Sequence, residues 1–294
     1  MHPAPDDARS PAASRPLLAA LATYVSAVVL LVTAESALVY GVAGVVAHGR
    51  ADRIDAIASE FARSVPGILC AGFVSSAALG LTALASARIQ GKRIIDRLRL
   101  GPSSASLAGT AAAIAGTFGL GLASGSVADL LGVGRTGSMN TIARMLAHAS
   151  MPQVGGALLT IAVLPAVAEE TLFRGLLQGL FVARLGRWTG IAVTAALFGL
   201  VHFDVVQGTL AAVVGLFLGW MAERLGGIRP GMLAHAVNNA LFVVTSTAPS
   251  ADCSSRRTLW VLAATGALGW VAATMVLRRC AAAPKKVPGL AGAD

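Results

Sequence analysis

Charged and aromatic residues are scarce in this chain of 294 residues. Only 13% of the residues are charged and 5% are aromatic, whereas 55% are hydrophobic. About 25% of the residues in a soluble domain are charged, so the composition argues against a soluble domain. The mean hydropathy of +0.73 agrees with this conclusion. The chain is therefore predicted to be a polytopic membrane protein.

Cysteine clusters and base-stacking surfaces are also lacking. Cys70, Cys253 and Cys280 are widely spaced and form no CxxC or metal-ligand pattern. The net charge of +9 would suit a nucleic-acid partner. However, the basic residues lie in short segments between apolar runs, without the interleaved aromatic side chains that base stacking requires. We therefore expect no nucleic-acid partner and interpret the basic segments as topology signals.

Eight apolar runs predict an all-α bundle of about eight transmembrane helices with a polar cavity inside the membrane. They cover approximately residues 16–47, 65–87, 105–131, 154–182, 188–205, 209–222, 230–246 and 259–277. With both chain ends in the cytoplasm, 15 of the 23 Lys and Arg residues lie on that side and seven on the other. This distribution agrees with the positive-inside rule.

The segments around these runs suggest a simple organisation. Residues 1–15 are predicted to be a disordered cytoplasmic leader, and residues 281–294 a flexible tail. Residues 16–150 are expected to hold the first three transmembrane helices, 151–247 the catalytic core, and 248–280 the last transmembrane helix.

A basic segment follows the second apolar run. Residues 88–99 contain five basic side chains interleaved with Ile89, Ile94, Ile95 and Leu98. This pattern is typical of an amphipathic segment on an anionic lipid surface. We expect its Ile and Leu side chains to enter the membrane interface on the cytoplasmic side.

Two adjacent carboxylates interrupt the fourth apolar run. An ionisable group at the bilayer centre costs about 2.5–3.5 kcal/mol, so such groups usually face a protein interior or a wet cavity. Arg174 follows Glu170 by four residues, a spacing that places both on one helix face. Arg174 is therefore expected to neutralise Glu170, which leaves Glu169 without a local partner. Pro165, one turn earlier, is expected to kink the helix and to open space for water.

Further polar residues occur in other apolar runs. His202 follows Phe198 by four residues, and Asn239 follows His235 by four. Lipid cannot satisfy polar groups, so helices that each expose a polar stripe pack with these stripes together. In straight alternating spans, however, the two histidines would lie at opposite ends of their helices. A tilted, broken or shortened span is needed to bring them together.

Glu35 is a further carboxylate, in the first apolar run. A neighbouring helix could satisfy it, or it could have a functional role.

In this order, the motifs resemble those of the CPBP intramembrane endopeptidases, a family that includes type II CAAX prenyl proteases and Abi-type and bacteriocin-processing proteins. The resemblance covers residues 153–245, about a third of the chain. It implies an all-helical bundle with catalytic residues around an intramembrane cavity. A departure is Asn238, which stands beside Asn239 and offers an alternative amide. The motifs are Glu169-Glu170-x-x-x-Arg174, Phe198-x-x-x-His202 and His235-x-x-x-Asn239.

The residue types suit peptide hydrolysis by water. Glu169 is expected to act as the base and His202 to help hold the water. His235 and Asn239 are expected to polarise the carbonyl group. The supporting residues are Glu170, Arg174 and Phe198.

Two other chemistries use different groups. Ser124, Ser126 and Cys70 are poor candidates for a nucleophile, because their runs contain no His. A zinc ion is a stronger alternative, since carboxylates and imidazoles are its usual ligands and would leave a bound water. The family has been described both as metal-dependent and as glutamate-dependent. We favour the version without a metal, because an amide is a poor zinc ligand and no HExxH pattern is present. The zinc set would be Glu169, Glu170, His202 and His235.

The expected substrate is a membrane-anchored or lipidated protein or peptide. Prenylated CAAX tails are the best-known substrates of the family, but the composition is typical of a bacterial chain, and few bacteria prenylate their own proteins. Peptide maturation or the processing of carboxy-terminal sorting signals at the bacterial inner membrane is therefore favoured. A transporter or a non-catalytic partner protein is the alternative, although no repeated halves are evident.

Overall fold

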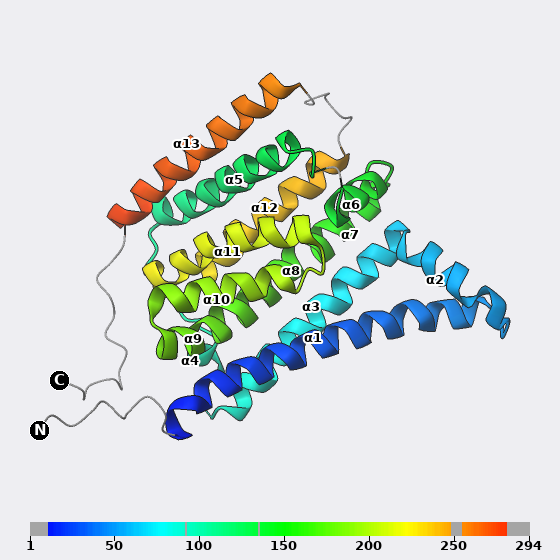
Figure 1. The fold of residues 1–294 in the computed structure, drawn as a ribbon, viewed down its shortest axis with the longest axis horizontal. Coiled ribbons are helices and arrows are strands. Elements are labelled where there is room, and N and C mark those ends of the chain that lie inside the picture. Colours follow the sequence, from blue (N-terminus) through cyan, green and yellow to red (C-terminus); the bar gives the residue numbers. More distant parts are fainter. Residues whose placement is uncertain (1–10, 92, 135, 248–254, 281–294) are drawn as a thin grey trace, which may run out of the picture.

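The computed structural model describes residues 11–91, 93–134, 136–247 and 255–280, and in this part of the chain every regular element is a helix (Figure 1). The predicted all-α membrane bundle is thus confirmed. The elements are α1 (Pro11–Val46), η1 (Ala51–Arg53), α2 (Ile54–Ala62), α3 (Val65–Ile89), α4 (Ile94–Arg97), α5 (Leu107–Leu130), α6 (Ser138–Leu146), α7 (Met151–Ala157), η2 (Leu158–Val163), α8 (Leu164–Glu169), η3 (Glu170–Leu177), α9 (Gln178–Leu185), α10 (Arg187–Leu200), α11 (Val205–Leu225), α12 (Arg229–Thr247) and α13 (Arg256–Cys280).

All eight predicted apolar runs are helical, and the protein is an integral, multi-pass membrane protein. Among the described residues, six helical stretches are long and apolar enough to cross a membrane: Pro16–Val46, Val65–Ile89, Leu107–Leu130, Met151–Leu185, Val205–Leu225 and Arg256–Cys280.

The two remaining runs form helices of a different kind. Helix α10 has only 14 residues, a length of about 21 Å at 1.5 Å per residue, against a hydrocarbon core of about 30 Å. It ends at Leu200 and not near residue 205 as predicted. Helix α12 has 19 residues but carries a polar stripe with His235 and Asn239. Both helices carry or precede residues that the sequence predicts for the catalytic site.

The amino-terminal boundary differs from its prediction. Helix α1 begins at Pro11, so residues 11–15 of the predicted leader are helical. Residues 1–10 and the predicted tail 281–294 lie outside the described part of the chain.

The predicted amphipathic segment over residues 88–99 contains a turn, and one of its apolar side chains is buried in the protein. Gly91 adopts a left-handed conformation, with φ of 72°, and ends the α3 helix region. Of the four apolar side chains, Ile89 is 85% exposed, but Leu98 is fully buried in the protein core. Arg99 then fixes the segment to α11 through a 2.6 Å ion pair with Glu223. The apolar residues thus serve partly as protein core, which the sequence pattern cannot distinguish from a lipid-facing surface.

The helices pack in successive layers (Figure 1). Helices α5 and α13 lie side by side at one edge, α1 and α3 contact each other at the opposite edge, and the segment α7–α9 and helices α10–α12 fill the space between them. Helices α10 and α11 approach closely at Gly199 and Gly208. A Cβ atom added to Gly199 would lie 2.4 Å from the Gly208 carbonyl oxygen. This close approach fixes the turn that follows α10.

Substitution Gly199→Ala is therefore expected to lower the thermal stability of the detergent-purified protein. Overpacking a close helix contact costs about 1–3 kcal/mol. The matched control is Gly179→Ala, because a Cβ atom at Gly179 would meet open space, and alanine favours a helix more than glycine does. A Gly199→Ala protein that melts at or above the temperature of Gly179→Ala would contradict the tight contact.

Candidate active site

The acidic motif lies in a continuous helical segment that contains two π-helical stretches. These stretches, η2 and η3, flank the short helix α8, and π-helical turns are rare and often occur at functional sites. Pro165 has no N–H group, so the carbonyl of Ile161, four residues earlier, loses its α-helical donor. The side-chain amide of Asn239 donates to this carbonyl at 3.4 Å. The irregular segment thus binds helix α12 through a backbone group that the proline leaves free.

Glu170 and Arg174 form an ion pair in the protein interior, as their spacing predicts. Nη1 of Arg174 lies 2.8 Å from Oε1 of Glu170, and both side chains are at most 1% exposed. The guanidinium carbon also lies 4.2 Å from the centroid of the Phe198 ring, within the range of a cation–π contact. A Cβ atom at Gly215 would lie 2.9 Å from Nη2 of Arg174. Helices α10 and α11 therefore enclose the pair closely.

His235 joins the two glutamates from helix α12. Its Nδ1 lies 3.2 Å from Oε1 of Glu170, and an ionised carboxylate can only accept a hydrogen bond, so Nδ1 donates. The other ring nitrogen, Nε2, lies 3.7 Å from Oε2 of Glu169. The hydrogen bond to Glu170 thus orients the ring so that Nε2 faces Glu169.

His202 reaches the same region because α10 ends early. It lies in the turn after Leu200, and its Nδ1 donates to the Phe198 carbonyl at 2.8 Å. The Phe198 ring is 5.1 Å from the His202 ring and 6.0 Å from the His235 ring, between centroids. A shortened helix, one of the arrangements that the sequence required, therefore brings both histidine rings against one phenylalanine.

A cavity of about 1490 Å³ lies in the bundle and is lined by Glu169, Phe198, His202, His235 and Asn239. The structure therefore brings together the four residues that the sequence predicted as catalytic. The supporting residues Glu170 and Arg174 do not line this cavity.

Other polar residues also line the cavity, and sequence reasoning gave them little or no role. Glu35 of α1 and Asn238 of α12 contribute to its wall, as does Asp129 of α5. Gly121 makes room for Asn238, since a Cβ atom there would lie 2.8 Å from its Oδ1. The Ser124 hydroxyl lines the cavity as well, but it donates to the Leu120 carbonyl of its own helix at 2.8 Å and shows no histidine base.

Gln178 is a further residue that the sequence analysis missed. It is fully buried, and its amide donates to Oε1 of Glu223 at 2.7 Å and to the Gly219 carbonyl at 3.0 Å. Its position could have been inferred, because Glu170, Arg174 and Gln178 follow one another at four-residue intervals and so share one face of the segment.

The four predicted alternative zinc ligands are partly engaged with other groups of the protein. Within the described ranges, no group of three or more His, Cys, Asp or Glu side chains is placed to hold a metal ion. One oxygen of Glu170 is bound by Arg174, and Nδ1 of His202 is bound by a backbone carbonyl. A buried arginine beside the carboxylate also disfavours a second cation at that point. Two of the four predicted ligands thus already have one donor atom bound within the protein.

Asp204 holds the turn that carries His202. Its carboxylate accepts hydrogen bonds from the backbone N–H groups of Gln207 in α11, at 2.7 Å, and of Ser138 in α6, at 2.9 Å. These two N–H groups hold the pKa of the Asp204 carboxyl below its ordinary value. One side chain thus caps two helices and links the α10–α11 turn to α6.

The Asp204 interactions predict a defined pH dependence. Because the pKa is lowered in the folded protein, the stabilisation is fully present above the unfolded value of about 3.9. It is lost as the pH falls through the folded value. Loss of a helix cap costs about 0.5–2 kcal/mol. Asp204→Ala should therefore melt below wild type at pH 7, and the difference should vanish at strongly acidic pH. Asp96, whose ion pair with Arg93 is largely exposed, provides the control: Asp96→Ala should melt like wild type throughout.

Breaking the buried ion pair should destabilise the protein. Arg174→Ala leaves the Glu170 charge buried without its partner, at a cost of about 3–5 kcal/mol. A double variant, Glu170→Gln/Arg174→Met, should recover much of the loss, because neither charge remains. Thermal unfolding in detergent compares these proteins, with Arg144→Ala on the exposed surface of α6 as the control. If Arg174→Ala melts like wild type but is inactive, the arginine acts on the substrate and not on Glu170.

Comparisons with known proteins agree with the motifs. Residues 152–241 match the family model described as Type II CAAX prenyl endopeptidase Rce1-like. A curated relative, "Uncharacterized 24.3 kDa protein" from Escherichia coli, is 36% identical over 97 residues, which are 31% of this chain and 45% of the relative. The chain thus spans less than half the length of that relative. No solved structure matches the chain.

The family match falls on the part of the chain that contains the predicted catalytic residues. All three motifs, from Glu169 to Asn239, lie inside residues 152–241. Over these residues the chain is similar to the Rce1-like type II CAAX prenyl endopeptidases, which confirms the CPBP family resemblance that its motifs predicted.

Proposed function

We propose that this protein is an intramembrane endopeptidase that hydrolyses a peptide bond near the membrane in a lipid-modified or membrane-anchored protein or peptide. One observation carries the proposal. Glu169, His202, His235 and Asn239 come from three separate segments of the chain, yet all four line one cavity. The match of residues 152–241 to an endopeptidase family supports this assignment.

Glu169 is the carboxylate available to act as the base. It lines the cavity, and its side chain is 14% exposed, whereas that of Glu170 is 1% exposed. The charge of Glu170 is already balanced by Arg174 at 2.8 Å. A general base must lie within hydrogen-bonding reach of the proton that it removes. Of the two adjacent glutamates, only Glu169 can be reached by water from the cavity.

The water is placed by Glu169 together with His235. Two atoms 3.7 Å apart, as are Oε2 of Glu169 and Nε2 of His235, can both lie within hydrogen-bonding distance of one water. Because Nδ1 of His235 donates to Glu170, a ring with one proton can only accept a hydrogen bond at Nε2. His235 thus helps to hold the water, a role that the sequence analysis gave to His202. His202 also lines the cavity, with Nε2 free to bind the water or the substrate.

Asn239 is the best donor for the developing oxyanion. Its amide carries two hydrogens, and the contact with the Ile161 carbonyl uses one of them. The second hydrogen is available to the substrate carbonyl, and such a donor stabilises the transition state more than the ground state. The same contact with Ile161 keeps the amide in a fixed orientation, so little reorganisation is required during the reaction.

The proposed reaction balances without a cofactor. Glu169 takes a proton from the water as its oxygen attacks the carbonyl carbon, and Asn239 donates a hydrogen bond to the oxyanion. The peptide C–N bond then breaks, and Glu169 returns the proton to the leaving nitrogen. The products are a carboxylic acid and an amine. Because the site lies among apolar helices, the substrate must reach the bilayer, as a lipid-modified or membrane-anchored segment does. A bacterial inner membrane is the proposed location.

Removing the base should abolish cleavage without affecting the fold. Glu169→Gln is expected to lower turnover by at least about 10²-fold, as for a lost general base. Candidate substrates come from comparing membrane proteomes of cells with and without the protein, and purified protein in detergent is then assayed on them. The control is Glu35→Gln, the same substitution at another cavity-lining carboxylate, with turnover near that of wild type. An active Glu169→Gln together with an inactive, folded Glu170→Gln would transfer the role to Glu170.

The same assay separates an enzyme from a transporter or a non-catalytic partner protein. Neither alternative would cut a membrane-anchored peptide that accumulates in cells lacking the protein. The absence of cleavage by the wild-type protein would therefore contradict the proposed function.

A further inference from the structure

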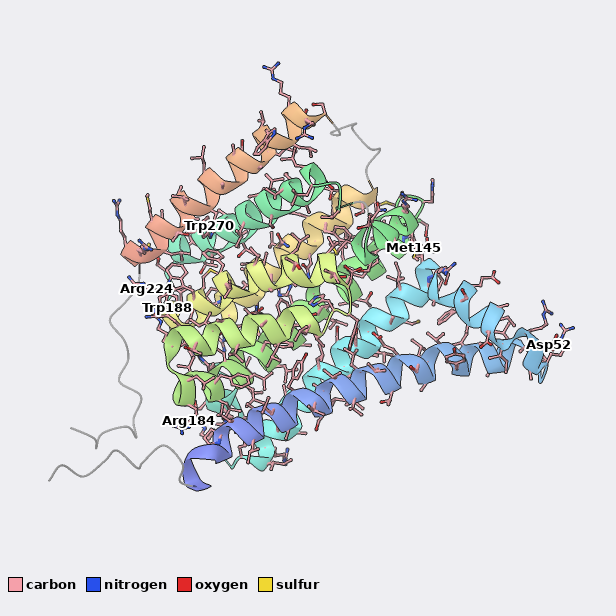
Figure 2. All side chains as sticks on the ribbon, viewed as in Figure 1. Asp52, Met145, Arg184, Trp188, Arg224 and Trp270 are labelled. Carbon is pink, nitrogen blue, oxygen red and sulfur yellow. The ribbon has the colours of Figure 1, made fainter. Side chains whose placement is uncertain are left out.

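The two ends of the helical bundle differ in charge. Figure 2 shows Arg184, Trp188 and Arg224 at one end, and Met145 and Asp52 at the other. We name the first the basic end. Among the described side chains, ten arginines lie at the basic end: Arg88, Arg93, Arg97, Arg99, Arg184, Arg187, Arg224, Arg229, Arg278 and Arg279. Six lie at the opposite end: Arg50, Arg53, Arg63, Arg144, Arg256 and Arg257.

Carboxylates strengthen this asymmetry. Asp96 and Glu223 lie at the basic end, whereas η1, α2 and the end of α5 place Asp52, Asp55, Glu60 and Asp129 at the opposite end. Segments rich in Lys and Arg remain on the cytoplasmic side of a membrane. The charge distribution of the folded helices therefore indicates that the basic end faces the cytoplasm.

The cavity lies in the half of the bundle that faces away from the basic end. Its wall includes no residue of α3 beyond Leu79, of α11 beyond Val214 or of α13 beyond Leu262. Helix α5, which runs away from the basic end, contributes residues only from Phe118 onward. On the side of the basic end, the cavity therefore ends near the middle of these four helices.

The cavity extends to the end of the bundle opposite the basic end. Asp129 and Gly132 at the end of α5, Met139 of α6, Thr245 of α12 and Arg256 at the start of α13 all line it. These ends of α5, α6, α12 and α13 lie opposite the basic end (Figure 1).

Toward the basic end, the path from the catalytic residues is closed by buried side chains. Glu170, Arg174 and Gln178 are each 0% exposed. Gln178 bonds to Glu223, which pairs with Arg99 at 2.6 Å, so a connected polar network fills this region. Apolar side chains that are at most 2% exposed surround it: Leu98, Phe173, Leu177, Phe181, Leu218, Met221 and Ile228.

We propose that the catalytic cavity opens on the non-cytoplasmic face of the membrane, so that the substrate is a membrane-anchored segment presented at that face. The inference that a substrate binds in this cavity rests on the proposed endopeptidase function. The side of the opening rests only on the charge asymmetry and the position of the cavity. The substrate class is therefore an exported protein or peptide that remains anchored in the membrane. A prenylated tail on the cytoplasmic surface would face the closed end.

Cysteine accessibility tests the side of the opening without any need for turnover. The starting protein has Cys70, Cys253 and Cys280 replaced by serine. Ser124→Cys then places a thiol on the cavity wall, and Arg187→Cys places one on the exposed start of α10 at the basic end. Each variant is treated with a charged, membrane-impermeant maleimide in intact spheroplasts and in inside-out vesicles. Arg144→Cys, on the exposed surface of α6, reports the opposite end.

The proposal predicts that Ser124→Cys and Arg144→Cys react in spheroplasts and that Arg187→Cys reacts only in inside-out vesicles. Reaction of Ser124→Cys only in inside-out vesicles would overturn it, and so would reaction from neither side. Thr245→Cys, where the cavity extends to the end opposite the basic end, provides a second cavity position if Ser124→Cys does not fold. Because labelling requires no substrate, a protein that labels as predicted but cleaves nothing would contradict the proposed function and leave the orientation supported.

Discussion

The buried ion pair between Glu170 and Arg174 is the interaction on which the site depends. Two charges with at most 1% exposure are tolerable in an apolar bundle only if they satisfy each other. The pair also binds the elements around it. Phe198 of α10 covers the guanidinium, Gly215 of α11 gives it room, and His235 of α12 donates to the carboxylate. Three helices are therefore positioned by one pair of side chains.

This arrangement separates the roles of two adjacent glutamates. Glu170 faces the interior, where its charge is used to hold Arg174 and His235. Glu169 lines the cavity, where its carboxylate lies 3.7 Å from Nε2 of the same histidine. The two side chains are of the same type, so their different surroundings decide which carboxylate is held inside the protein and which is open to the cavity.

Sequence reasoning succeeded where the signal is local. The Glu170–Arg174 pair follows from a four-residue spacing, and the shared cavity follows from the cost of polar groups in lipid. The early end of α10 and the double capping by Asp204 depend on contacts between distant segments, such as Ser138 with Asp204, and no local pattern reports them. The prediction for residues 88–99 placed Leu98 in the membrane interface, whereas Leu98 is buried in the protein core. An apolar side chain such as Leu98 suits a lipid surface and a protein core equally well, so periodicity alone cannot choose between them.

The central claim is that the ion pair supports the site while Glu169 performs the chemistry, and the cleavage rate of Glu170→Gln/Arg174→Met tests it most directly. In this variant both charges are gone, the amide that replaces the Glu170 carboxylate retains an oxygen that can accept from Nδ1 of His235, and Glu169 is intact. The account predicts that the folded double variant turns over substrate well above the level of Glu169→Gln. A double variant that melts normally but is as inactive as Glu169→Gln would contradict it, because Glu170 or Arg174 would then take part in the reaction itself.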